Sequence, residues 1–195
     1  MVAIGIDGGR NDVSELIFAI YFTSTHQYGP YSLLVAWFSM RLKILVGTMT
    51  GTADYVAQAI QMDCADLVSD IDVHLMDDLN IAVFAVEQAK DAIYIICTST
   101  YGTGDVPENA RALYESLDSA PEFLRHVRYG VMSLGNSIYP QTFCFGGQNF
   151  DQRLQSLGAQ RIGEIWRHDA SSSDLPEIEG VAWCRQWLAS ALNLG

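Results

Sequence analysis

A run of hydroxyl side chains and glycines follows the first strongly apolar strand pattern of the sequence. It reads Gly47-Thr48-Met49-Thr50-Gly51-Thr52-Ala53, and a helical pattern starts within it. Hydroxyls together with free backbone N–H groups at the positive end of a helix dipole form an anion site. The spacing excludes Walker A and dinucleotide-binding motifs, and no basic residue occurs between Lys43 and Lys90. This segment therefore predicts that neutral donors hold a phosphate monoester, while a plain helix cap stays open as the alternative.

Two further loops combine aromatic residues with hydroxyls and glycines after an apolar run. The second loop is Thr98-Ser99-Thr100-Tyr101-Gly102-Thr103-Gly104-Asp105, and the third is Leu134-Gly135-Asn136-Ser137-Ile138-Tyr139-Pro140-Gln141-Thr142-Phe143-Cys144. An aromatic ring in such a loop can stack on a flat ligand, and glycines let backbone amides approach the ligand's edge. Exposed tyrosines are commonly packing or turn residues. Two aromatic loops beside a phosphate loop nevertheless favour a flat phosphorylated ligand.

These loops must be positioned by the elements between them, and the sequence predicts an alternation of strands and helices. The expected strands are Leu42–Gly47, Ile71–Leu75, Ala92–Cys97, Tyr129–Leu134 and Ile162–Trp166. The expected helices are Thr52–Cys64, Pro107 to about Leu117 with Asp105 as N-cap, Asn149–Leu157 and Pro176–Leu192. The alternation predicts an α/β fold with a doubly wound, five-stranded parallel sheet in three layers, α/β/α. Ligands bind beyond the carboxyl ends of such strands, where the three loops would meet.

Composition narrows the class of protein and of partner. A chain of 195 residues with 49% hydrophobic and 17% charged residues has room for one domain with a substantial core. The formal net charge of −12 argues against nucleic acid or an anionic membrane as a partner and favours a basic protein. The four cysteines lack CxxC spacing and are predicted to be reduced thiols in a cytoplasmic chain. The four histidines lack ligand spacing, so no metal site is expected.

Taken together, the three loops resemble those that hold FMN in flavodoxins and in the FMN domains of diflavin reductases. The resemblance is greatest to short flavodoxins of the MioC type, through Gly104-Asp105-Val106-Pro107-Glu108-Asn109, Tyr139-Pro140-Gln141-Thr142-Phe143-Cys144 and Ser156-Leu157-Gly158-Ala159-Gln160. It covers about Lys43 to the C-terminus, with the motifs in family order. One departure is Ala53, where many flavodoxins carry a further hydroxyl, which puts one phosphate hydrogen bond in question.

The resemblance implies a flavodoxin-like fold with FMN as the cofactor. Hydroxyls and amides of the first loop would hold the phosphate, and Tyr101 and Tyr139 would line the two faces of the flavin ring. In the family a glycine peptide of the second loop turns when the flavin is reduced, and Gly102 and Gly104 are the candidates. No catalytic residue is expected, because the chemistry belongs to the cofactor. The expected cofactor-binding residues are Thr48, Met49, Thr50, Gly51, Thr52, Ala53, Ser99, Thr100, Tyr101, Gly102, Thr103, Gly104, Leu134, Gly135, Asn136, Tyr139, Phe143 and Cys144.

The same resemblance implies an electron carrier that works as a monomer in the cytoplasm. It would take electrons singly from an NADPH-dependent flavodoxin reductase and pass them to a redox enzyme as acceptor. Acidic residues would form the docking face, unless they serve solubility alone. Asp169 and Glu179 fall where diflavin reductases carry acids close to the flavin. The residues of the acidic face are Asp66, Asp70, Asp72, Asp77, Asp78, Asp105 and Glu108.

Two other functions stay open on the same fold. One is a flavodoxin-fold NAD(P)H-dependent quinone or flavin oxidoreductase, against which the absence of a nicotinamide fingerprint weighs. The other is a phospho-accepting receiver, which needs an aspartate at the end of the third strand, where this chain has Cys97 and Thr98.

Residues 1–40 lie outside the resemblance. Their two apolar patches, Leu16–Phe22 and Leu33–Phe38, are shorter than the roughly 20 residues that span a bilayer. No basic segment precedes the first patch, so a signal peptide is not expected. Met40 opens a short basic start that runs into an apolar strand. We therefore expect Met40 to be the natural start, residues 1–40 to be an upstream extension, and residues 41–195 to form the FMN-binding domain.

Overall fold

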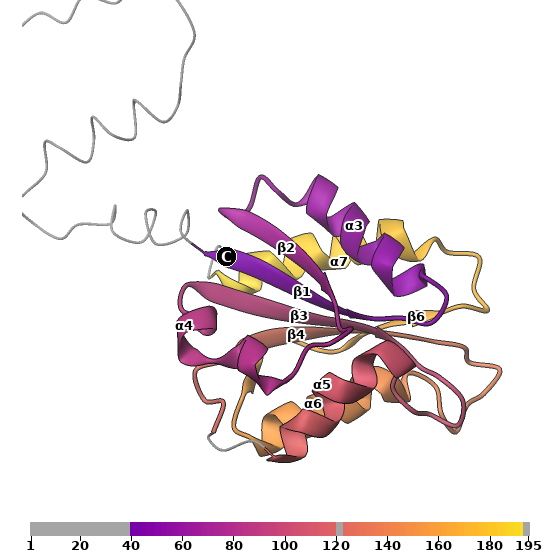
Figure 1. Ribbon diagram of the computed structural model, residues 1–195. Coiled ribbons are helices and arrows are strands. Elements are labelled where there is room, and N and C mark those ends of the chain that lie inside the picture. Colours follow the sequence, from indigo (N-terminus) through magenta and orange to yellow (C-terminus); the bar gives the residue numbers. More distant parts are fainter. Residues whose placement is uncertain (1–39, 120–122, 193–195) are drawn as a thin grey trace, which may run out of the picture. The chain divides into compact units, whose positions relative to one another are not determined.

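The computed structural model describes residues 40–119 and 123–192, which contain a parallel β-sheet (Figure 1). The expected extension before Met40 lies outside these residues. Within them, the sheet follows the order β2-β1-β3-β4-β5, and the last strand, β6, also pairs with β4. All of these pairs are parallel. The strands are β1 (Arg41–Gly47), β2 (Asp70–Leu75), β3 (Ala92–Ser99), β4 (Arg128–Gly135), β5 (Gln160–Arg161) and β6 (Trp166–Asp169).

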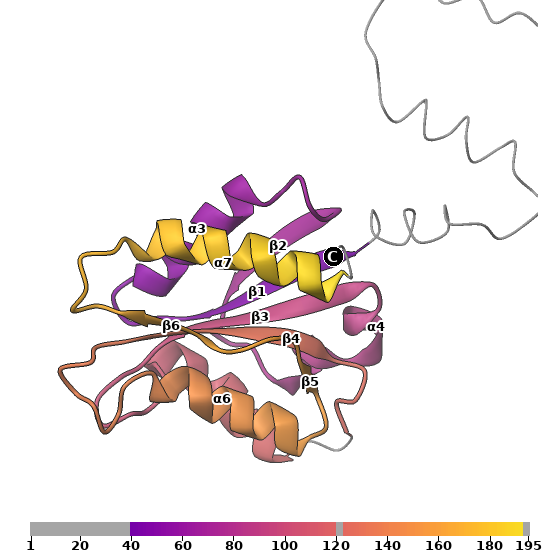
Figure 2. The same ribbon diagram turned by 180° about the vertical axis from the view of Figure 1, so that it is seen from behind.

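Helices cover both faces of the sheet. Figures 1 and 2 show α3 (Thr52–Asp63) and α7 (Pro176–Ala191) over one face and α5 (Arg111–Ser116) and α6 (Phe145–Ser156) over the other. The remaining helical segments are α4 (Val86–Ala89) and the 3₁₀ turns η1 (Ile81–Phe84), η2 (Glu108–Ala110) and η3 (Leu117–Ser119). The predicted three-layer, doubly wound α/β fold is confirmed.

The sheet separates two apolar cores. Along β1, Ile44 and Val46 pack with α3 and α7, whereas Leu45 packs with residues of α5 and α6 on the other face. Both sets of side chains are fully buried. A strand buried on both faces has to be apolar at every position, which is why β1 reads as a continuous hydrophobic run in the sequence. All four cysteines are free and buried in the described part of the chain.

Two of the predicted helices differ from the structure at their starts. Asp105 is not an N-cap: its N–H donates to the carbonyl of Tyr101 at 2.8 Å, and its own carbonyl accepts from the Tyr101 N–H at 2.9 Å. The following helix opens as η2 at Glu108, directly after Pro107. The helix expected from Asn149 begins four residues earlier, at Phe145. At Asp105, backbone pairing inside the second loop takes the place of the helix cap that the sequence suggests.

The fifth strand is interrupted where the sequence predicts it to be continuous. The predicted span Ile162–Trp166 falls mostly in a gap between the short strands β5 and β6, each of which pairs with β4. The gap turns at Gly163, whose φ is +68°. Most of the predicted span therefore lies outside both strands, and the chain reaches the loop that follows β6 only after this break.

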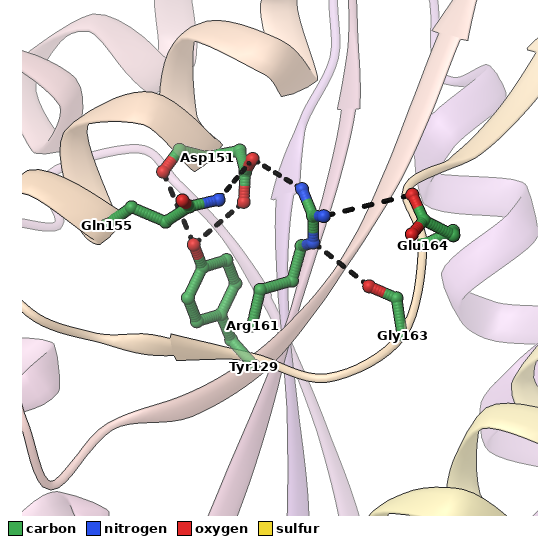
Figure 3. A network of polar contacts seen from close by, with 6 residues as sticks. All are labelled: Tyr129, Asp151, Gln155, Arg161, Gly163 and Glu164. Atoms are coloured by element: carbon green, nitrogen blue, oxygen red, sulfur yellow. Dashed lines mark hydrogen bonds and ion pairs between the residues drawn. The ribbon is translucent and has the colours of Figure 1, made fainter.

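A buried polar network lies beside the break (Figure 3). The Arg161 guanidinium donates to Asp151 Oδ2 at 2.6 Å and to the Gly163 carbonyl at 3.0 Å. The Tyr129 hydroxyl donates to Asp151 Oδ1 at 2.8 Å, and Gln155 Nε2 donates to Oδ2 at 2.8 Å. Burial and the neighbouring carboxylate raise the pKa of Tyr129, which keeps its hydroxyl protonated as a donor. The network ties α6 to β4 and to the start of the break.

Replacing Arg161 with Met should destabilise the domain, because it leaves the Asp151 carboxylate, which is 10% exposed, without its cation. Loss of one partner of a buried ion pair costs about 3 kcal/mol of unfolding free energy, measured by urea denaturation. The control is Glu164→Gln, because the Glu164 side chain is 94% exposed and its oxygen lies 3.8 Å from Arg161. That variant should stay within about 0.5 kcal/mol of the parent. Equal stability of all three proteins would contradict the role of the network.

Candidate functional site

The carboxyl ends of β1, β3, β4 and β6 meet at one edge of the sheet and border a cleft of about 410 Å³. This volume lies within the usual range of small-molecule sites, about 300–1,000 Å³. Hydroxyls, glycines and one amide dominate its wall. The lining residues are Thr50, Thr52, Ser99, Thr100, Gly102, Leu134, Gly135, Asn136, Tyr139, Thr142, His168 and Ala170.

The cleft brings together residues from all three predicted loops. The predicted site residues that line it are Thr50, Thr52, Ser99, Thr100, Gly102, Leu134, Gly135, Asn136 and Tyr139. The predicted site residues that are not among its lining residues are Thr48, Met49, Gly51, Ala53, Tyr101, Thr103, Gly104, Phe143 and Cys144. Sequence reasoning did not single out Thr142, His168 or Ala170. Thr142 falls inside the third loop, whereas the other two lie in a segment with no recognisable ligand pattern.

The first loop presents the N-terminus of α3 to the cleft. Its N-cap, Gly51, has φ +89°, a conformation that glycine adopts at little cost, and no side chain caps the helix. The Thr48 hydroxyl accepts a hydrogen bond from the Gly51 N–H at 2.9 Å and so shapes the turn. Ala53 is completely buried and offers the site only its backbone. The first-turn amides of α3, which have no intrahelical acceptors, stand next to the hydroxyls of Thr50 and Thr52.

Asn109 fixes the position of this loop, a role that the motif containing it did not reveal. Its side-chain oxygen accepts from the Thr48 N–H at 2.9 Å, and its nitrogen donates to the Val46 carbonyl at 3.3 Å. The same nitrogen donates to Asp77 at 3.2 Å. One side chain after the second loop thus holds the first loop and the end of β1 together.

The second loop is a tight turn closed by the paired backbones of Tyr101 and Asp105. Tyr101 stands at the rim with 49% of its surface exposed. Gly104 is held firmly: its carbonyl accepts from Asn149 Nδ2 at 3.0 Å, and a Cβ there would meet the Phe145 ring at 2.9 Å. Gly102 lines the cleft, and its nearest neighbour would lie 3.9 Å from an added Cβ. The two glycines of this loop therefore differ in their freedom to move.

The turn of the third loop is closed by the side-chain amide of Asn136. The Asn136 side chain accepts from the Ile138 N–H at 3.0 Å, which leaves Tyr139 over the cleft with 65% of its surface exposed. Cys144 ends the loop in the core, where its thiol donates to the Ser133 carbonyl at 3.2 Å. Burial raises the pKa of the Cys144 thiol to about 11, so this side chain is a packing group.

The third loop is held in place by Asp169, the last residue of β6, and by Ser171 in the segment that follows. Asp169 Oδ1 accepts from the Ser137 N–H at 2.9 Å and from the N–H and hydroxyl of Ser171 at 3.0 and 2.8 Å. These hydrogen bonds hold the pKa of Asp169 well below its ordinary range. The carboxylate is thus ionised above the ordinary pKa of an aspartate, and the clamp weakens as pH falls through the lowered value. Glu179 of α7 contacts the neighbouring His168 at Nδ1, at 3.1 Å.

Comparison with known proteins decides the family. The flavodoxin family model matches residues 44–183, which is most of the chain. The chain belongs to the flavodoxin family. Flavodoxin YqcA of Escherichia coli K12 is 35% identical over 147 residues, covering 74% of this chain and 93% of that protein. FMN is accordingly the cofactor of this flavodoxin.

Other relatives agree with this assignment. The sulfite reductase [NADPH] flavoprotein alpha-component of Vibrio cholerae is 37% identical over 80% of the chain, but this match covers 24% of that longer protein. Protein MioC of Escherichia coli O157:H7 is 27% identical and matches 75% of this chain and 95% of its own. A cysteine-to-serine mutant of flavodoxin from Pseudomonas aeruginosa superposes with a TM-score of 0.63 at 28% identity, over 77% of this chain and 98% of that one. The predicted resemblance is confirmed.

Replacing Asp169 with Ala should weaken FMN binding about tenfold, because the third loop loses its external anchor. Quenching of FMN fluorescence during titration of the apoprotein measures the dissociation constant. Asp174→Ala removes an exposed carboxylate from the same segment and serves as the matched control. Unchanged affinity in the Asp169 variant would show that the clamp does not order the site.

Proposed function

We propose that this flavodoxin binds FMN in the cleft and carries electrons singly from an NADPH-dependent flavodoxin reductase to acceptor redox enzymes. The observation that carries the proposal is the uncapped N-terminus of α3, aimed at a cleft whose wall carries hydroxyls from three loops. A helix N-terminus with neutral donors suits the phosphate of FMN. Residues 41–195 form the FMN-binding domain in this proposal, with residues 1–40 as an upstream extension and the carrier a monomer in the cytoplasm.

The residues of the cleft fit the parts of the cofactor. Thr50, Thr52 and the first-turn amides of α3 bind the phosphate. Tyr139, which lines the cleft, would cover one face of the ring, and the exposed Tyr101 of the second loop would cover the other. FMN supplies the electron-transfer chemistry, and the protein orients it, excludes water from its faces and leaves one edge accessible. No side chain of the site is required to act as a general acid or base.

The second loop adjusts to the charge of the cofactor through Gly102. Of the two candidate glycines, Gly104 is fixed by Asn149 and by the Phe145 ring, whereas an added Cβ at Gly102 would make only an ordinary contact, with Asp105 Oδ2 at 3.9 Å. Its φ of +52° is accessible to glycine at no steric cost. The peptide that follows Gly102 can therefore turn its carbonyl toward the flavin.

Replacing Gly102 with Ala should narrow the gap between the potentials of the first and second electron, because a Cβ restricts the turning peptide. Stepwise anaerobic reduction followed by visible absorbance measures both potentials. Gly102→Asn is the matched control, since Asn tolerates positive φ better than Ala and adds a comparable Cβ. It should narrow the gap less than Gly102→Ala does. An unchanged gap in both variants would remove Gly102 from the mechanism.

The charge of the acidic surface as a whole, and not that of any single side chain, supports docking of a basic reductase. The net charge of −12 steers a positively charged partner most strongly at low salt. Some of the predicted acids have local partners: Asp66 pairs with Arg185 at 3.0 Å, and Glu108 pairs with Arg111 at 2.9 Å. These exposed pairs contribute little to stability, so the acids remain available to a partner. In the part of the chain that the structure describes, no helix is long and apolar enough to cross a membrane.

Apoprotein titrated with FMN and with riboflavin tests the phosphate site. FMN should bind at least about 100-fold more tightly, because two charge-assisted hydrogen bonds to the phosphate contribute about 1.5–3 kcal/mol each. Equal affinity for the two flavins would reject the phosphate site.

Steady-state NADPH oxidation separates the carrier from the alternative NAD(P)H-dependent quinone or flavin oxidoreductase. The loaded protein alone should be inactive and should reduce cytochrome c only when an NADPH-dependent flavodoxin reductase is added. The rate should fall as salt is raised, because salt screens docking. NADPH oxidation by the protein alone, with a quinone as acceptor, would favour the enzyme.

A further inference from the structure

Asp77 lies where three segments of the chain meet at the end of β1. The strand is flanked by β2 and β3, so the turn after β2 and the segment after the second loop approach its end from opposite sides. The Val46 carbonyl accepts from the Met76 N–H at 2.9 Å and from Asn109 Nδ2 at 3.3 Å. The same Asn109 nitrogen donates to Asp77 Oδ2 at 3.2 Å. Asp77 and Asn109 thus bridge the end of the strand from which the phosphate loop starts.

The turn that carries Asp77 is fixed at its base. The Leu79 N–H donates to the Met76 carbonyl at 3.1 Å, and the Met76 side chain is completely buried. Asp77 itself is exposed to solvent. A turn anchored in this way holds the Asp77 carboxylate beside Asn109 even though the residue lies at the surface.

The three partners of Asn109 determine which way its amide points. The Thr48 N–H needs an acceptor, whereas the Val46 carbonyl and the Asp77 carboxylate need donors. An asparagine amide offers one acceptor oxygen and two N–H donors, which matches this set. Turned by half a rotation, the amide would place its oxygen against two other oxygens and its nitrogen against an N–H. A hydrogen bond to a carboxylate is stronger than one to a neutral carbonyl, so Asp77 strengthens the preference for the observed orientation.

Thr48 connects Asn109 with the donors that are proposed to bind the phosphate. Its N–H donates to Asn109 Oδ1 at 2.9 Å, and its hydroxyl accepts from the Gly51 N–H at 2.9 Å. Next to it, the Met49 sulfur accepts from the Glu108 N–H at 3.4 Å. Gly51 is the N-cap of α3, whose first-turn amides are the proposed phosphate donors. A loop held at these points has its donors in place before an anion arrives, which lowers the entropy cost of binding.

The charge of Asp77 taken alone predicts the opposite effect on the cofactor. The carboxylate and the phosphate of FMN are both negative, so their direct interaction is repulsive and weakens binding. Positioning of the loop through Asn109 strengthens binding. The direction in which FMN affinity changes when Asp77 is removed therefore separates positioning from repulsion.

We propose that Asp77, acting through Asn109, is a positioning residue of the phosphate loop and makes this protein select flavins that carry a phosphate. The proposal rests on the proposed FMN-binding function. Neither side chain is among the residues that line the cleft, so both act through Thr48 and not by contact with the cofactor. Their effect is confined to the phosphate, because the second and third loops cover the ring. The carboxylate of Asp77 thus serves the cofactor as well as the acidic face.

The test is the ratio of the riboflavin Kd to the FMN Kd, measured by quenching of flavin fluorescence during titration of the full-length apoprotein. Riboflavin carries the ring without the phosphate, so the ratio isolates the contribution of the phosphate. The variants are Asn109→Ala, Asp77→Ala and the double variant. Asp78→Asn is the matched control, because it removes one negative charge from the same turn and asparagine tolerates the φ of +60° at this position.

Asn109→Ala should lower the ratio about tenfold and Asp77→Ala about threefold, because each removes a hydrogen bond that positions the loop. The fall should come from weaker FMN binding, with the riboflavin Kd nearly unchanged. The double variant should have the same ratio as Asn109→Ala, because Asp77 acts through that side chain. Asp78→Asn should leave the ratio unchanged or raise it, since it removes only a repulsive charge.

An unchanged or higher ratio in Asp77→Ala overturns the proposal, as does an equal loss of affinity for both flavins, which would be a purely structural effect. Additive losses in the double variant, or a fall in Asp78→Asn as large as that in Asp77→Ala, overturn it too. If Asn109→Ala does not fold, the ratio of Asp77→Ala decides alone. All of these outcomes leave the proposed FMN site intact when the parent prefers FMN. A parent that binds both flavins equally would reject the phosphate site and this inference together.

Discussion

The pairing of β1 with β3 is the contact on which the site depends. The chain leaves β1 through α3 to reach β2 on one side and later returns to place β3 on the other side of β1. The connections therefore diverge to opposite faces of the sheet, and the ends of the two strands are left without a covering helix. Gly47 stands opposite Thr98, and Ser99 opposite Leu134, so the three loops start side by side. The position of the cleft follows from strand order before any side chain of the loops is considered.

In the loops, backbone groups form the anion site and side chains hold the loops in position. The anion site depends on a helix terminus that Gly51 leaves uncapped, and Asn109 keeps this terminus in place from the neighbouring loop. The third loop is held by Asp169, whose carboxylate takes its hydrogen bonds from the backbone and from Ser171. None of these contacts adds a charge to the lining of the cleft.

The features that could be predicted are those determined by residues close together in the sequence. Leu42–Gly47 is buried on both faces, and its sequence is a continuous apolar run. Each loop carries its hydroxyls and glycines in one continuous stretch. Backbone pairing inside a loop and contacts between distant segments were not predictable. Asp105 looked like a helix cap but pairs with Tyr101. Asn109 holds Thr48 from 61 residues away, and Asp169 holds Ser137 from 32 residues away.

The break between β5 and β6 separates two ends of the molecule. On one side, Arg161 and Asp151 join β5 to α6, and on the other side β6 leads to the cleft. Gly163 and Glu164, between them, are exposed to solvent. A peptide tag or a reporter domain inserted between Gly163 and Glu164 would leave the sheet edge beside the Gly163 carbonyl that accepts from Arg161. The exposed break is thus an attachment point in the middle of the sheet edge, at the opposite end of β6 from the cleft.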